Sequence, residues 1–140
     1  MKILHVITSL RTGGAEKLMV DLLPRMKAKG HEVDLCVFDG VRTPFYEELE
    51  SKGVKVIPLG YSVYSLFNIC KLVPLMRGYD IVHSHNTACQ YFVALASFFS
   101  KCKIYINSAS KNYRVYIAVA AIYHFFVIIN FRCFHIRFLL

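Results

Sequence analysis

Continuous apolar runs and mixed segments alternate along the first hundred residues. The chain opens with such a run at residues 2–8, KILHVIT, which is typical of a parallel strand buried on both faces. Further strand-like runs follow at residues 32–38, 54–59, 79–85 and 103–107. The segments between them predict helices at residues 15–30, 43–53, about 63–77 and 87–101.

The first predicted helix shows the periodicity most clearly. Apolar residues recur at spacings of three and four, which predicts that one face packs on a core, at Ala15, Leu18, Met19, Leu22, Leu23 and Met26. Gly30 suits the residue that follows the last helical turn. Pro24 lies inside the segment and is expected to kink the helix, because proline has no backbone N–H to donate.

Regular alternation of strands and helices predicts an α/β fold with a Rossmann-like, doubly wound parallel sheet. In such sheets, ligands bind beyond the carboxyl ends of the strands. Several residues that could bind a ligand or take part in catalysis follow predicted strands in this sequence, namely Gly13, Gly14, Asp39, His83 and His85.

Composition adds three constraints. The formal net charge is +8, and every acidic residue lies at or before Asp80. This excess of positive charge favours anionic partners such as nucleotide phosphates or an anionic membrane face. The alternative is that the basic side chains bind no partner and only make the helix surfaces soluble. The five cysteines have no regular spacing, which predicts reduced thiols in a cytoplasmic protein. The apolar run at the N-terminus is too short for a signal peptide.

Two adjacent glycines, Gly13 and Gly14, separate the first strand from the first helix. A helix N-terminus attracts anions, and glycine lets a phosphate approach the backbone closely. Arg11 could add a charged donor. The spacing matches neither the dinucleotide nor the P-loop pattern, so a plain tight turn is the alternative.

Three blocks of sequence together resemble one family. LRTGGAEKLMVDLL, KGHEVDLCVF and YDIVHSHN, within residues 1–102, are similar to the N-terminal half of family 4 glycosyltransferases of the GT-B type. This resemblance implies a retaining, usually metal-independent transfer of sugar from a nucleotide-sugar donor. It also implies two Rossmann-like domains, of which the N-terminal one mainly holds the acceptor. The glycine-rich loop, which closes over the donor diphosphate in the family, matches Gly13 and Gly14.

The histidines of DIVHSHN end the fourth predicted strand. Alternation places His83 and His85 on the same face, but two histidines without a third ligand nearby are a weak metal signal, so no metal is predicted. The resemblance implies that His85 is the catalytic residue that lies against the transferred sugar. It leaves His83 and Asn86 in supporting positions on the acceptor side. His5 is expected to be a core or supporting residue.

Two rival functions stay open at this point. Asp39 ends the second predicted strand, where a dinucleotide enzyme carries its ribose-binding acid, so an NAD-binding oxidoreductase module is one alternative. A non-enzymatic, membrane-associated binding protein is the other. No motif that combines aromatic and basic residues predicts nucleic-acid binding.

Residues 108–140 form an apolar, basic tail that differs from the rest. From Lys103 onward the sequence has no Asp, Glu, Gly or Pro, and residues 115–131 are almost entirely apolar. A membrane span, a surface or self-packing helix, and a truncated or frameshifted sequence are the three interpretations.

We therefore expect a Rossmann-like glycosyltransferase N-terminal domain at residues 1–107. Its expected partners are a nucleotide-sugar donor and a glycan or lipid-linked acceptor, with no further cofactor and no nucleic acid. The expected location is the cytoplasm, with peripheral contact to the inner membrane face. Because the donor half is absent from the sequence, we expect little activity from this chain alone.

Overall fold

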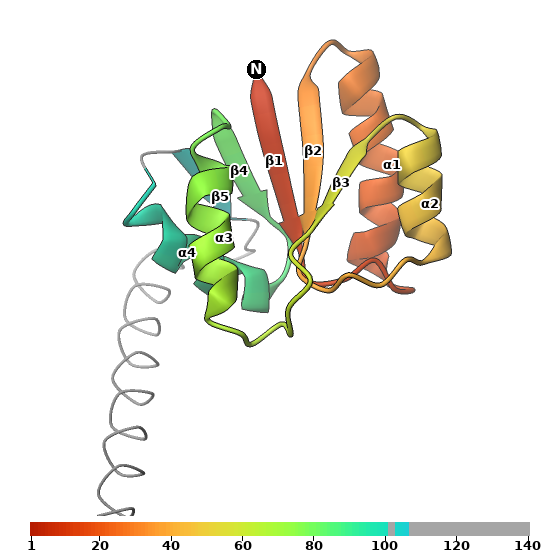
Figure 1. The fold of residues 1–140 in the computed structure, drawn as a ribbon. Helices are drawn as coiled ribbons and strands as arrows, with labels where there is room; N and C mark the ends of the chain where they lie inside the picture. Colours follow the sequence, from red (N-terminus) through yellow and green to blue (C-terminus); the bar gives the residue numbers. More distant parts are fainter. Residues whose placement is uncertain (101–102, 107–140) are drawn as a thin grey trace, which may run out of the picture. The chain divides into compact units, whose positions relative to one another are not determined.

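The computed structural model describes residues 1–100 and 103–106, in which five strands alternate with four helices (Figure 1). The strands are β1 Lys2–Ile7, β2 Glu32–Val37, β3 Lys55–Pro58, β4 Ile81–Ser84 and β5 Lys103–Ile106. The helices are α1 Gly14–Ala28, α2 Pro44–Ser51, α3 Phe67–Met76 and α4 Thr87–Ser97. The predicted tail at residues 108–140 and its three interpretations lie outside the described residues.

The strands form one parallel sheet with the order β3-β2-β1-β4-β5. The chain runs outward from β1 to β3 and then returns, so that β4 pairs with the other side of β1. Between β1 and β4, therefore, the direction of the chain reverses, and this is the position where open α/β sheets bind ligands. The predicted doubly wound Rossmann-like fold is confirmed.

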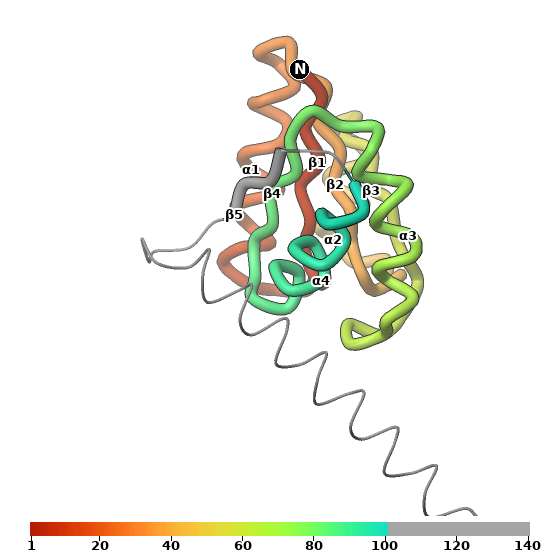
Figure 2. The backbone as a smooth tube through the Cα atoms, turned by 90° about the vertical axis from the view of Figure 1, so that its left-hand side faces the viewer, coloured from red at the N-terminus to blue at the C-terminus, as the bar shows by residue number. Residues whose placement is uncertain are grey.

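Two hydrophobic cores lie on the two faces of the sheet. Side chains alternate along β1, so Ile3 and Ile7 join a core with α1 and α2, whereas Leu4 and Val6 join a core with α3 and α4. Figure 2 shows α1 and α3 on opposite sides of the strands. His5 has the parity of Ile3 and Ile7, and only 1% of its surface is exposed.

Several helix details differ from the sequence prediction. Leu18 was expected in the core face of α1 but is 46% exposed, whereas its neighbour Val20 is fully buried. Helix α3 starts at Phe67, later than predicted, because the preceding residues form a turn in which Ser65 donates its backbone N–H to Ser62. Helix α1 includes Pro24 in its interior.

The cysteines of the described residues are unpaired. Cys36 and Cys89 are buried, as expected, but Cys70 is exposed on α3. Among residues 1–100 and 103–106, no helix combines the length and the apolar character that crossing a membrane requires.

Candidate functional site

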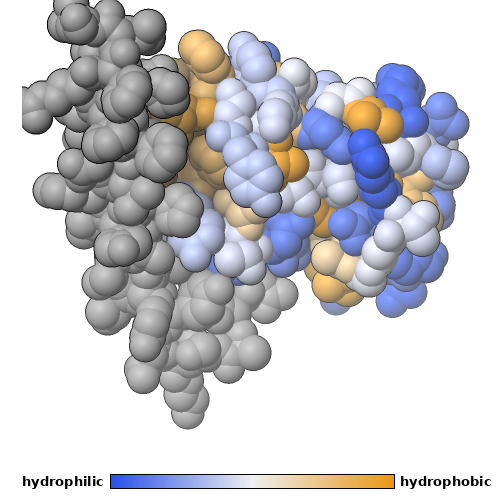
Figure 3. All heavy atoms as spheres, turned by 90° about the horizontal axis from the view of Figure 1, so that it is seen from below, coloured by the Kyte–Doolittle hydropathy of each residue, from blue (hydrophilic) through white to orange (hydrophobic). Residues whose placement is uncertain are grey.

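The residues selected from the sequence gather at the carboxyl edge of the sheet, beside the switch between β1 and β4. Gly13 and Gly14 lie between β1 and α1, and His85 and Asn86 lie between β4 and α4. Both α1 and α4 therefore begin at this edge and present the positive ends of their dipoles there. Figure 3 views the domain from below, where hydrophilic and hydrophobic residues are interspersed.

The glycine pair does not require glycine for its backbone conformation. Gly13 precedes α1 with φ −176° and ψ 169°, which is extended backbone. Among the described residues, the glycines with positive φ are Gly30, Gly53 and Gly60, so Gly14 is also outside the left-handed region. A tight turn that only glycine can adopt therefore does not explain residues 13 and 14.

The space beside Gly13 is occupied by a side chain, whereas the space beside Gly14 is open. A Cβ added to Gly13 would lie 2.2 Å from Oε2 of Glu16, so the Glu16 carboxylate occupies the space next to that residue. A Cβ added to Gly14 would meet nothing within 4 Å. An anion can therefore approach the backbone at Gly14 freely, but at Gly13 it would have to displace a carboxylate of the same sign.

Substitution of Gly14 by alanine separates a folding role from a binding role. The position is open, helical and free of positive φ, so Gly14→Ala should raise the free energy of unfolding by about 0.4–1 kcal/mol. The matched control is Gly30→Ala, which should destabilise the domain because Gly30 has φ 85°. Urea denaturation of both variants measures the two changes. Destabilisation by Gly14→Ala would mean that the fold itself needs the glycine.

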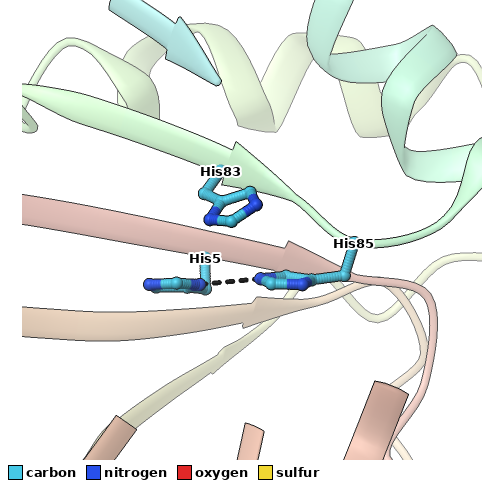
Figure 4. A group of neighbouring side chains, drawn as sticks. All are labelled: His5, His83 and His85. Atoms are coloured by element: carbon cyan, nitrogen blue, oxygen red, sulfur yellow. Dashed lines mark hydrogen bonds between the residues drawn. The ribbon is translucent and has the colours of Figure 1, made fainter. Parts of the chain in front are cut away.

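Three histidines form a cluster across the switch between β1 and β4 (Figure 4). His5 and His83 are register partners on the two paired strands, and His85 follows β4 two residues after His83. His5 Nδ1 and His85 Nε2 share a hydrogen bond of 2.7 Å. The ring centroids of His83 and His85 lie 4.3 Å apart, and the sequence prediction that they share a face is confirmed.

Burial lowers the pKa values of all three histidines. The pKa of His5 falls to about 3, mainly through burial, and the charges that His85 and His83 would carry lower it further. The pKa of His85 falls to about 4 through burial and the effect of His83. The pKa of His83 is also lowered by burial. At neutral pH the cluster is uncharged, so His85 acts there as a neutral hydrogen-bonding group.

Asn86 links the two loops of the site. It occupies the position before α4, but its side chain makes no capping hydrogen bond to that helix. Its Nδ2 donates to Thr8 Oγ1 at 2.7 Å, which ties the end of β4 to the end of β1. The Oδ1 atom of Asn86 is buried without a hydrogen-bond partner.

Arg11 and Asp39 form an ion pair at the same edge. Arg11 Nε lies 3.7 Å from Asp39 Oδ2, and the arginine side chain is 69% exposed. Burial raises the pKa of the Asp39 carboxyl, and the Arg11 charge partly offsets this rise. Such an exposed, long ion pair is weak, so Arg11 can exchange its partner for another anion.

Two further residues contribute to the site. His5 is buried and hydrogen-bonded to His85, which agrees with the expected core or supporting role. Its place in a three-histidine cluster was not predicted, because it depends on β1 lying next to β4 in the sheet. Thr8 carried no signal of its own. Alternation along β1 predicts the face of the sheet on which His5 lies. It could have indicated the contact of His5 with His83 and His85 only if the strand order had been known.

A family comparison identifies the class of protein. Residues 12–107, more than half of the chain, match the model of Glycosyltransferase Family 4. The chain belongs to this family, and the sequence-based recognition is confirmed.

One curated protein and two solved structures are similar to this chain. The capsular polysaccharide biosynthesis glycosyltransferase CapH of Staphylococcus aureus is 29% identical over 99 residues, which are 70% of this chain and 27% of CapH. A glycosyltransferase from Rickettsia africae superposes with a TM-score of 0.64 at 20% identity, over 82% of this chain and 32% of that one. Anabaena HepE, solved with UDP and glucose, gives a TM-score of 0.61 at 20% identity, over 76% of this chain and 29% of HepE. This chain thus spans about a quarter to a third of each relative.

Proposed function

We propose that residues 1–107 are the acceptor-side domain of a retaining, nucleotide-sugar-dependent glycosyltransferase. One observation carries this proposal: the glycine-flanked start of α1 and His85 follow the neighbouring strands β1 and β4 at the switch point of the sheet, in a chain of family 4. The acceptor would be a cell-surface glycan or a lipid-linked glycan, which is in keeping with the capsular role in the name of CapH.

The roles of the residues follow from their positions. The backbone at Gly14, at the open N-terminus of α1, would contact the donor diphosphate. Gly13 would take part only after the Glu16 carboxylate moves away. Arg11, in its weak pair with Asp39, would add a charged hydrogen bond to the diphosphate.

His85 would contact the transferred sugar. Its Nε2 is held by His5, which leaves Nδ1 as the nitrogen that can face a sugar hydroxyl. A neutral imidazole suits a transition state of oxocarbenium character, because an imidazolium would repel the developing positive charge. His83 and Asn86 would support this arrangement, His83 by packing against the His85 ring and Asn86 by tying the loop to Thr8.

Ligand binding by the purified chain tests this proposal. We expect weak binding of UDP and UDP-sugars, reduced by Gly14→Ala, and no measurable sugar transfer, because these residues supply one wall of a site between two domains. Ligand-observed NMR measures the binding, and a radiolabelled donor measures the transfer. Robust sugar transfer by the 140-residue chain would contradict the expectation that this chain alone is inactive.

The same binding experiment with NAD(H) distinguishes the proposed glycosyltransferase from the rival function, an NAD-binding oxidoreductase module. Asp39 is the observation that favours that rival, because it follows β2 and is partly buried. The spacing of Gly13 and Gly14, which does not match the dinucleotide pattern, counts against that rival. Binding of NADH in preference to UDP-sugars would overturn the glycosyltransferase proposal.

The proposed location is the cytoplasm, with peripheral contact to the inner membrane face. The net charge of +8 favours an anionic surface, and the unpaired Cys36, Cys70 and Cys89 fit a reducing compartment. Flotation with anionic vesicles tests the membrane contact, and a chain that stays with the unbound fraction at low ionic strength would contradict it.

A further inference from the structure

The histidine cluster has the composition of a metal site. One ring nitrogen from each of His5, His83 and His85 lies within 4.8 Å of the other two. The three residues come from two paired strands, which hold their backbones in fixed register. No carboxylate or thiol takes part in this group, so its donors are imidazole nitrogens alone, which suit zinc, copper and nickel.

The spacing is close to that of a tetrahedral ion. Zinc binds imidazole nitrogen at about 2.0–2.1 Å, so two ligand nitrogens stand roughly 3.3 Å apart. His5 Nδ1 and His85 Nε2 lie 2.7 Å apart, and one nitrogen from each of the three rings lies within 4.8 Å of the other two. Small ring rotations would therefore bring the three nitrogens around one ion. The ligand form of histidine is the neutral imidazole, which burial favours in this cluster.

We propose that His5, His83 and His85 form a binding site for a divalent transition metal such as Zn²⁺, with a fourth position open to water. Binding of the ion would break the His5–His85 hydrogen bond and engage His85. An ion bound to His85 Nε2 would repel the developing positive charge of the transition state, so the metal would act as a reversible inhibitor. This last consequence, unlike the binding itself, rests on the proposed function.

Titration of the tag-free chain with Co²⁺ and Zn²⁺ tests the site. We expect one Co²⁺ per chain, with the visible absorption of a tetrahedral ion, and its displacement by Zn²⁺. Loss of an outer-sphere partner of a metal ligand typically weakens binding about 10- to 100-fold. His83→Gln and His85→Gln, which remove ligands themselves, should weaken binding at least that much. His5→Asn tests the third ligand. If this variant does not fold, the His83 and His85 variants are sufficient to test the site.

The control variant is His31→Gln. It should leave the affinity unchanged, because His31 lies between α1 and β2 and is not part of the cluster. Zn²⁺ should also raise the melting temperature of the wild type, but not that of His83→Gln.

Two outcomes would overturn the proposal: no specific Co²⁺ binding, or binding that persists in both His83→Gln and His85→Gln. A chain that binds Co²⁺ through this cluster but does not bind UDP-sugars would support the metal site and count only against the proposed function. Inhibition is then read separately, as Zn²⁺-dependent loss of transfer in an enzyme that contains this domain.

Discussion

Replacement of His85 by alanine is expected to lower the rate of sugar transfer by about 100- to 1,000-fold, the usual effect of removing one group that stabilises transition-state charge. The reason is the position of His85 at the switch point, where its Nε2 is fixed by His5 and its other nitrogen can face the sugar. Transfer can be measured after residues 1–107 are joined to the donor-binding domain of another family 4 glycosyltransferase.

The matched control for this experiment is His31→Ala. His31 lies between α1 and β2, away from the cluster, so its replacement should leave the rate unchanged. The loss caused by His85→Ala should appear in kcat, with donor binding nearly unchanged, because the proposed diphosphate contacts come from the α1 side. A variant that keeps transfer within about threefold of the wild type would exclude a catalytic role for His85.

Acidification is expected to destabilise the domain by an amount on the order of 5 kcal/mol between neutral pH and about pH 4.5. The unfolded chain binds protons at histidine near the ordinary pKa of 6.5, whereas folding lowers the pKa of His5 to about 3 and that of His85 to about 4. Stability is therefore greatest above 6.5 and falls as the pH drops, until the folded cluster itself takes up protons.

Urea denaturation at a series of pH values measures this fall. His85→Gln should make the pH dependence shallower, because it removes one of the groups whose pKa the fold lowers. Burial raises the pKa of Asp39, so that group acts in the opposite direction at the lowest pH values. A free energy of unfolding that stays constant from neutral pH to about pH 5 would show that the histidines are not held neutral by the fold.

Much of the fold could be predicted from local patterns. The strand runs and helix periodicities gave the order of elements, because burial on one or both faces leaves a period in the sequence. The boundaries were less accurate. Helix α3 begins only at Phe67, since the side chain of Asn68 donates to the backbone oxygen of Ser62 and stabilises a turn before it. Leu18 was misplaced because the helix contacts its sheet through Met19, Val20 and Leu23.

The candidate site was predicted in part. The sequence identified Gly14 and His85 as residues that follow strands, and alternation placed His83 and His85 on one face. The occupation of the space beside Gly13 by the Glu16 carboxylate could not be foreseen, because it depends on the path of one flexible side chain. The bond from Asn86 to Thr8 joins residues 78 positions apart, and no local pattern records such a contact.

The sequence by itself determined the order of strands and helices, the shared face of His83 and His85, and the family resemblance, because each depends on residues close together in the chain. Only the tertiary structure decided that His5 joins these two histidines. That contact requires β4 to return beside β1, and strand order is set by the packing of helices on both faces of the sheet. The cluster of three histidines is therefore a property of the fold and not of any one segment.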